Sequence, residues 1–397
     1  MPHLGDIMNA MAFRLFGGGR GGKIIAVADI GSGSAGFGIF QVPSHGPAIA
    51  LAAERAVLPI EERTPQAAIA AIAAELTKVG QKVIAASAGK TGGKPRHPEL
   101  LVCVIRAPWT NAEAVREGSH FEKEMTVTGP MISELAKKTL ARATTVDQAH
   151  FLDANVARVE LNGYPTKKPE GKKANELAVT SLISGCDPDI RASIERALEG
   201  ILPHTPRQLR GGARTLLTVL REYASQQDYV AVDMGGEGSA MTVVRDGAPS
   251  EQILVPEGVY TILRRISTTG IPEETLSLMR MLAREECSGP ACDSTLQALA
   301  RVEPELVKIF GEAMAKCAAT RKIPNNFFLV THPDMADWLA KFFSRIDFTQ
   351  FTRTAQPYAV RVLAPKDMSA WVSEAPGVVL DCGLAVGGAL VNIEENA

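Results

Sequence analysis

The sequence predicts an α/β protein with two related lobes that face each other across a cleft. A β-rich run, a glycine-rich turn and a second β-rich run occur twice, as ADIGSGSAGFGIF near the start and as VDMGGEGSAMTVV past the middle. Aligning the two turns places Asp29 over Asp233 and Gly31 over Gly235. Self-similarity at one large offset indicates a duplicated structural unit.

The composition excludes several classes of function. The 397 residues are enough for two to four packed units, with 46% hydrophobic and 22% charged residues. No apolar stretch approaches the roughly 20 residues of a membrane span. The 42 Lys plus Arg nearly balance the 44 Asp plus Glu, so the chain has no excess of positive charge that would favour binding of nucleic acid. We expect a globular protein that binds no nucleic acid.

The cysteines indicate a reduced, cytoplasmic location. They form no CxxC pair, and the chain begins without the apolar run and cleavage site of a secretory signal. Cys287 and Cys292 lie close together, but no histidine is nearby, so we expect two half-buried hydrophobic side chains and no zinc site.

The first lobe is predicted to follow a flexible leader. Residues 1–22 combine an apolar cluster with a glycine run, which is typical of a frayed terminus and less so of a docking peptide. Residues 23–108 then form the first lobe. Thr64 and Pro65 predict a helix from Gln66, and the strand LLVCVI begins at Leu101.

A small inserted α+β domain is predicted at residues 109–172. This region is rich in polar residues. It contains the β-like segments EMTVT (124–128) and VARVELNGY (to 164), with a helix at about 132–143 between them. We expect the chain to return to the first lobe at 173–226, with a strand ELAVTSLI at 176–183, a helix after Asp187-Pro188 and an Arg-rich helix at 206–223.

The second lobe is predicted at residues 227–376. A mainly helical region (258–322) precedes a strand FFLV, a helix from Pro333 and a strand at 358–363. Residues 377–397 then form a C-terminal helix, around Gly383, that returns to the lobe interface.

The two turns predict a phosphate and magnesium site. Glycine lets backbone N–H groups crowd round phosphate oxygens, and an Asp at the end of the preceding strand can hold a hydrated magnesium ion. Asp29 and Asp233 are therefore the predicted metal ligands. Glu237 is the only further carboxylate in the loops and is the candidate for orienting an attacking water, with a solvated turn residue as the alternative. The predicted nucleotide-binding residues of the loops are Asp29, Gly31, Ser32, Gly33, Asp233, Gly235, Gly236, Gly238 and Ser239.

This arrangement resembles the actin-like ATPase superfamily, whose members carry a DxG phosphate hairpin in each lobe. With the domain inserted after the strand at Leu101 and the late helix at Gly383, residues 23–391 look like the FtsA and PilM group of cell-division and type IV pilus assembly proteins. The resemblance implies a two-lobed, ribonuclease H-like ATPase fold with ATP and Mg²⁺ as ligands. It also implies a scaffold under the inner membrane that gathers the cytoplasmic tail of a membrane partner, PilN-like or a division protein, and that self-associates.

The chain departs from that group in two places. Where relatives have a glycine pair that contacts adenosine, the strand FFLV runs into Thr331 and His332, which are the positions assigned to the nucleoside. The segment around 209–213 offers Arg and Gly but no side chain to orient water, so at most weak ATPase activity is expected. The acidic end NIEENA lacks the membrane helix of FtsA-like proteins, which favours the PilM-like alternative.

The sequence is also compatible with other functions. A small-molecule kinase of the same superfamily would use the same cleft, and a degenerate adaptor would have lost nucleotide binding. A dinucleotide fingerprint at Gly31–Gly36 is disfavoured because a β-like run follows it where that motif needs a helix. A P-loop at Gly89-Lys90-Thr91 lacks its first glycine, since position 84 is Ile84.

Overall fold

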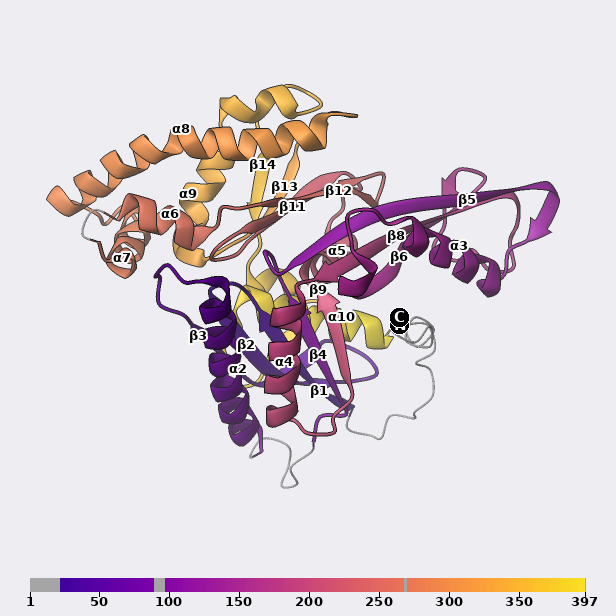
Figure 1. Cartoon of the computed structure of the whole chain (residues 1–397), viewed down its shortest axis with the longest axis horizontal. Helices are drawn as coiled ribbons and strands as arrows, with labels where there is room; N and C mark the ends of the chain where they lie inside the picture. Colours follow the sequence, from indigo (N-terminus) through magenta and orange to yellow (C-terminus); the bar gives the residue numbers. More distant parts are fainter. Residues whose placement is uncertain (1–21, 89–96, 268–269, 397) are drawn as a thin grey trace.

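Two mixed β-sheets, one in each lobe, form the body of the molecule, and a third sheet projects from its side (Figure 1). The computed structural model describes residues 22–88, 97–267 and 270–396. The predicted leader, apart from its last residue, and the Gly89-Lys90-Thr91 segment lie outside these residues.

The first lobe is built on a six-stranded sheet with the order β15-β3-β2-β1-β4-β9. Its strands are β1 (Lys23–Ile30), β2 (Ser34–Val42), β3 (Ala48–Val57), β4 (Leu100–Ile105), β9 (Arg207–Gly211) and β15 (Val372–Glu374). β1 pairs antiparallel with β2 and parallel with β4, so the first glycine-rich turn is the β1–β2 hairpin connection.

Helices cover both faces of this sheet. On one face, α2 (Pro65–Ser87) and α4 (Pro188–Ile201) pack on alternate residues of β1 and β4. Thr64 caps α2 as predicted by accepting a hydrogen bond from the Ala67 N–H at 3.3 Å. The apolar residues of α2 recur every three to four positions and face the sheet. Each such buried aliphatic side chain stabilises the fold by about 1.5–3 kcal/mol.

The opposite face joins the two lobes. There α5 (Gly212–Tyr223) and α10 (Cys382–Asn396) lie against the first sheet. The same hydrophobic core includes residues of the second sheet, such as Tyr229 and Phe328. The lobes therefore share one continuous core.

The second lobe repeats the pattern with a five-stranded sheet of order β12-β11-β10-β13-β14. Its strands are β10 (Tyr229–Met234), β11 (Ser239–Arg245), β12 (Ala248–Val255), β13 (Asn326–Val330) and β14 (Ala359–Val362). Its helices are α6 (Val259–Ile266), α7 (Pro272–Ala283), α8 (Pro290–Ala318) and α9 (Pro333–Phe343). An aromatic and aliphatic core, with Phe310, Phe342 and Phe343 fully buried, holds these helices on the sheet.

The inserted domain is a four-stranded sheet of order β5-β8-β6-β7 that carries one helix. Its elements are β5 (Thr110–Thr126), α3 (Gly129–Arg142), β6 (Phe151–Leu161), β7 (Tyr164–Pro165) and β8 (Lys173–Cys186). In Figure 1 it extends sideways from the junction of the lobes.

Three expectations about elements are wrong. The strand predicted at 176–183 is β8, which pairs with β5 and β6 of the inserted domain instead of returning to the first lobe. The helix expected from 206 begins only at Gly212, because residues 207–211 form β9 beside β4. The chain also returns to the first sheet before residue 377, since β15 pairs with β3.

The expectation for the paired cysteines is wrong as well. Cys287 and Cys292 form a disulfide, with their Cα atoms 5.8 Å apart, between α7 and the start of α8. The described cysteines Cys103, Cys186, Cys317 and Cys382 are free thiols. The cysteine pattern therefore does not by itself argue for a reducing compartment.

Candidate functional site

The two acidic turns lie at matching places in the two sheets. Asp29, near the end of β1, pairs in register with Val104 of β4, and Asp233 of β10 pairs with Val330 of β13. The carboxyl ends of parallel strands meet at one edge of a sheet, which is where ligands bind in such folds. The structure brings the two carboxylates together at the lobe junction, where both contact the side chain of Arg106.

Arg106 is the cation that the two turns share. It directly follows β4, and its Nε donates to Asp233 Oδ2 at 2.9 Å while an Nη2 hydrogen donates to Asp233 Oδ1. Its Nη1 lies 3.5 Å from Asp29 Oδ2. The Asp29 side chain is 2% exposed and that of Arg106 is 16% exposed. A nearly buried guanidinium therefore links the first lobe to the second.

Arg55 is a second cation on Asp29. Its Nη2 lies 2.5 Å from Asp29 Oδ2 and 2.8 Å from Asp381 Oδ1. The register explains the reach, because Asp29, Gly36 and Arg55 lie in one row across β1, β2 and β3. Directly opposed residues of antiparallel strands share a face. A Cβ at Gly36 would lie 2.8 Å from the Arg55 Nη2, so the missing side chain lets Arg55 cross β2.

The third carboxylate, Asp381, joins this pair to α10. Its Oδ1 accepts from the Leu384 N–H at 3.0 Å and so caps the helix. Burial opposes ionisation of Asp381, but Arg55 and the helix N–H outweigh it and hold its pKa below the ordinary value. Burial likewise opposes the charge on Arg55 and Arg106, yet the neighbouring aspartates raise the pKa of both guanidinium groups. Three carboxylates and two guanidinium groups give the cluster a net charge of −1 (−3 + 2).

The two glycine-rich loops touch each other. The Glu237 N–H donates to Ser32 Oγ at 2.8 Å, and the Tyr260 hydroxyl donates to the Gly33 carbonyl at 3.1 Å. A Cβ at Gly236 would lie 3.1 Å from the backbone of Gly33. The cleft is therefore closed at the hairpin tips by contact between the lobes.

The remaining loop residues form hydrogen bonds within the two turns and with the start of α6. The Gly31 N–H donates to the Ser34 carbonyl at 3.0 Å, and the Gly235 N–H donates to the Gly238 carbonyl at 2.9 Å. The carbonyls of Gly235 and Gly236 accept from the first N–H groups of α6. The Ser239 hydroxyl donates to the Glu257 carbonyl at 2.5 Å.

Glu237 has a partner of its own. Its two carboxylate oxygens accept from the Nη1 and Nη2 of Arg264 at 2.8 and 2.6 Å. A carboxylate held in a bidentate pair is poorly placed to take a proton from water. Its predicted catalytic role finds no support in this geometry.

Thr331 and His332 lie where the second sheet meets α9. His332 caps α9, with its Nδ1 accepting from the Asp334 N–H at 3.3 Å. Burial lowers the pKa of His332 below its ordinary value. The Thr331 hydroxyl is buried and has no partner among the described residues. Both residues hold a strand-to-helix turn at the position assigned to the nucleoside.

The residues at the junction do not fit magnesium and a nucleotide as they stand. A cavity lies beside Asp29, Arg106 and Asp233. The volume in which the centre of a water molecule fits is about 20 Å³. That is room for about one ordered water. Within the described ranges, no group of three or more His, Cys, Asp or Glu side chains is arranged to hold a metal ion. The positions predicted for a cation are taken by guanidinium groups.

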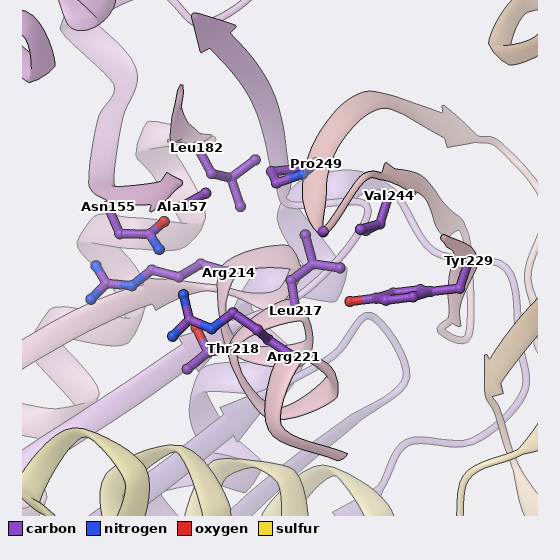
Figure 2. Close-up of a pocket in the computed structure, with 11 residues that line it drawn as sticks. Asn155, Ala157, Leu182, Arg214, Leu217, Thr218, Arg221, Tyr229, Val244 and Pro249 are labelled. Carbon is purple, nitrogen blue, oxygen red and sulfur yellow. The ribbon is translucent and has the colours of Figure 1, made fainter. Parts of the chain in front are cut away.

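A second pocket lies where the inserted domain, α5 and the second sheet meet (Figure 2). Measured in the same way as the junction cavity, its volume is about 30 Å³, so the two hollows differ little in size. Leu182, Leu217, Val244 and Tyr229 give it apolar walls, and Asn155 and Arg214 also line it (Figure 2). The other lining residues are Ala157, Thr218, Arg221, Gly247 and Pro249.

Two polar atoms in the wall of this pocket lack a partner. Asn155 Oδ1 and Arg214 Nε are buried without a hydrogen bond in the described chain. The outer nitrogens of Arg214 are paired with Asp153 at 3.1 Å and Glu394 at 2.9 Å. The pocket thus combines apolar walls with polar side chains in its lining, as binding sites do.

The sequence pattern indicated Asp29 and Asp233 but not Arg55, Arg106 and Asp381. Arg106 carried a signal, because it directly follows the predicted strand LLVCVI; that strand is β4, which runs parallel to β1, and such strand ends converge. Arg55 carried no such signal, since its position depends on the exact hairpin register. Asp381 lies inside the segment 377–397 predicted as the C-terminal helix, whereas the helix itself begins at Cys382 and Asp381 caps it.

Comparison with known proteins identifies the fold. No protein-family model matches the chain, and no curated protein matches it. The chain of known structure from the PilM-PilN type IV pilus biogenesis complex superimposes with a TM-score of 0.58 and 13% identity, covering 94% of this chain and 98% of that one. The ethanolamine utilization protein EutJ from Carboxydothermus hydrogenoformans gives a TM-score of 0.44 and 11% identity over 96% of this chain and 94% of that one.

A Bacteroides thetaiotaomicron protein with an actin-like ATPase fold gives a TM-score of 0.36 and 9% identity over 88% of this chain and 96% of that one. The duplicated hairpins, the shared core and the inserted domain agree with the likeness to the PilM chain. The likeness to the PilM chain therefore confirms the predicted fold class, the two-lobed actin-like fold.

Proposed function

We propose that this protein is a PilM-like scaffold that binds a segment of a membrane-anchored partner at the cytoplasmic face of the inner membrane. The observation that carries the proposal is the pocket between the inserted domain, α5 and the second sheet. The similarity to the PilM chain of a PilM–PilN complex supports a PilN-like partner. No helix in the part of the chain that the structure describes is long and apolar enough to cross a membrane.

The chemistry of the pocket suits a peptide. Its apolar walls favour aliphatic side chains, and the polar side chains of Asn155, Thr218 and Arg221 in its lining can hydrogen-bond to a peptide backbone.

The lobe junction supports a binding protein over a kinase. A kinase needs a carboxylate free to accept a proton from the acceptor hydroxyl. Asp29, Asp233 and Asp381 are all paired with Arg55 or Arg106, and Glu237 is paired with Arg264. ATP and Mg²⁺ would enter this cleft only if these ion pairs opened.

Isothermal titration calorimetry of the full chain tests the proposal. The probe is a synthetic peptide from the cytoplasmic end of the PilN-like protein encoded in the same genome. Thr218 lines the pocket on α5 and is half-buried, so Thr218→Arg should fill the pocket and weaken binding at least tenfold. Thr77→Arg, a half-buried threonine on the remote helix α2, is the matched control.

Equal affinity of the wild type and Thr218→Arg would place the partner elsewhere. No binding of the peptide by the wild type, with the fold intact by circular dichroism, would argue against the scaffold function with a PilN-like partner.

A further inference from the structure

The position between the two acidic turns belongs to the chain itself. Arg106 lies against both Asp29 and Asp233, where the sequence alone predicted a magnesium ion. Arg55 lies on the other side of Asp29 and binds Asp381 as well. Each guanidinium thus neutralises carboxylates from two separate parts of the fold.

We infer that Arg55 and Arg106 are the permanent cations of the lobe junction, and that this chain holds its lobes together without taking up a metal ion or a nucleotide. The inference concerns the lobe junction and is independent of the partner pocket. It makes the protein a degenerate member of its fold, in which side chains have the bridging role of an ion.

The neighbouring glycines fit these arginines closely. Gly36 lets Arg55 cross β2, as the register shows. At the first turn of α10, a Cβ at Gly383 would lie 2.1 Å from Asp29 Oδ2 and 2.7 Å from Arg55 Nη2. The backbone of α10 therefore closes directly over the ion pair, and little space remains for a phosphate group beside Asp29.

Displacement by magnesium is unfavourable. The ion would have to break the two hydrogen bonds between Arg106 and Asp233 and leave a guanidinium group buried without a partner. Binding of a phosphate by the arginines is also unfavourable, because both guanidinium groups are already paired and the cluster carries a net charge of −1 (−3 + 2).

The first test measures the thermal unfolding of the wild-type protein. Its Tm is compared without additive, with MgCl₂, with ATP plus MgCl₂, and with ATP plus EDTA. A ligand that binds only the folded state raises the Tm in a saturable, concentration-dependent way. We expect no saturable rise in any arm. A rise with ATP plus MgCl₂ would overturn the inference, and a rise with ATP plus EDTA would show that the arginines bind phosphate.

The second test replaces Arg106 so that the lobe junction can bind a divalent ion. Arg106→Gln removes the charge and leaves Asp29 and Asp233 without their shared cation, so a divalent ion should now bind between them. We expect Mn²⁺ affinity, measured by electron paramagnetic resonance of the free ion, to be at least tenfold tighter than in the wild type. Adding Asp233→Asn to this variant should abolish the gain.

The matched control is Arg264→Gln, which breaks the adjacent Arg264–Glu237 pair but leaves Arg106 in place, and it should gain no Mn²⁺ binding. A folded Arg106→Gln protein without tighter Mn²⁺ binding would contradict the inference. If that variant does not fold, the ATP and MgCl₂ arms of the wild-type measurement still decide it.

Discussion

At the scale of single residues, Asp381 connects the ion cluster to the C-terminal helix. One oxygen serves both Arg55 and the Leu384 N–H, so a single carboxylate caps α10 and holds an arginine. Asparagine also caps helices but carries no charge. Asp381→Asn should therefore keep the helix cap and remove the ion pair with Arg55. Because a third of the Asp381 side chain is exposed, we expect this change to cost about 1 kcal/mol of unfolding free energy at pH 7.

The pH dependence of this loss has a defined sign. The pKa of Asp381 is lowered in the folded state, so its ionisation stabilises the fold above its ordinary pKa near 4. That stabilisation is lost as the pH falls through the folded-state pKa. Urea unfolding at pH 7, 5 and 3 should therefore show the gap between wild type and Asp381→Asn shrinking below about pH 4. A gap that stays constant down to pH 3 would assign the loss to the cap.

The sequence could predict the anionic half of the lobe junction but not the cationic half. Asp29 and Asp233 belong to short motifs that recur, and local pattern is enough to find them. Arg55 becomes relevant only once β2 and β3 pair so that it lies opposite Gly36. A shift of one residue in that register would turn its side chain to the other face of the sheet. Register is set by tertiary packing, which a single sequence does not display.

At the scale of elements, the disulfide ties the helices of the second lobe. Cys287 and Cys292 close a loop between α7 and α8, and a loop of this length stabilises the fold by about 2 kcal/mol in the chain-entropy estimate. Cys292 is also 3% exposed and so lies inside the helical layer. Reduction should lower the Tm by a few degrees. Thermal unfolding with and without dithiothreitol measures it, and the double variant Cys287→Ser/Cys292→Ser should show no further response to the reductant.

The elements that were assigned wrongly share one physical cause. The run ELAVTSLI is buried on both faces, and β8 is the strand with β5 on one side and β6 on the other. Periodicity shows that such a strand is buried but not in which sheet. Likewise, RQLRG contains good helix formers, yet β9 forms because β4 offers it an open edge. Pairing partners far along the chain outweigh local propensity here.

At the scale of the whole molecule, the lobes meet at glycines as well as at charges. The Cβ of an alanine at Gly33 would lie 2.4 Å from the Tyr260 ring, which is closer than real Cβ contacts. Gly33 has no positive φ that would itself strain an alanine, so the cost of Gly33→Ala is a clash between the lobes. Since Tyr260 is buried in the second core, the first hairpin has to move away from α6.

We therefore expect Gly33→Ala to open the junction and destabilise the protein by about 1–3 kcal/mol, the usual cost of overpacking. Small-angle scattering should show a larger radius of gyration than in the wild type, and urea unfolding should show a lower midpoint. Gly200→Ala on α4 is the matched control, because no atom lies within 4 Å of its Cβ position, and it should leave the radius unchanged and the stability equal or slightly higher. Identical scattering of Gly33→Ala and the wild type would mean that Tyr260 adjusts within its own lobe, and that the ion pairs of Arg106 alone set the spacing of the lobes.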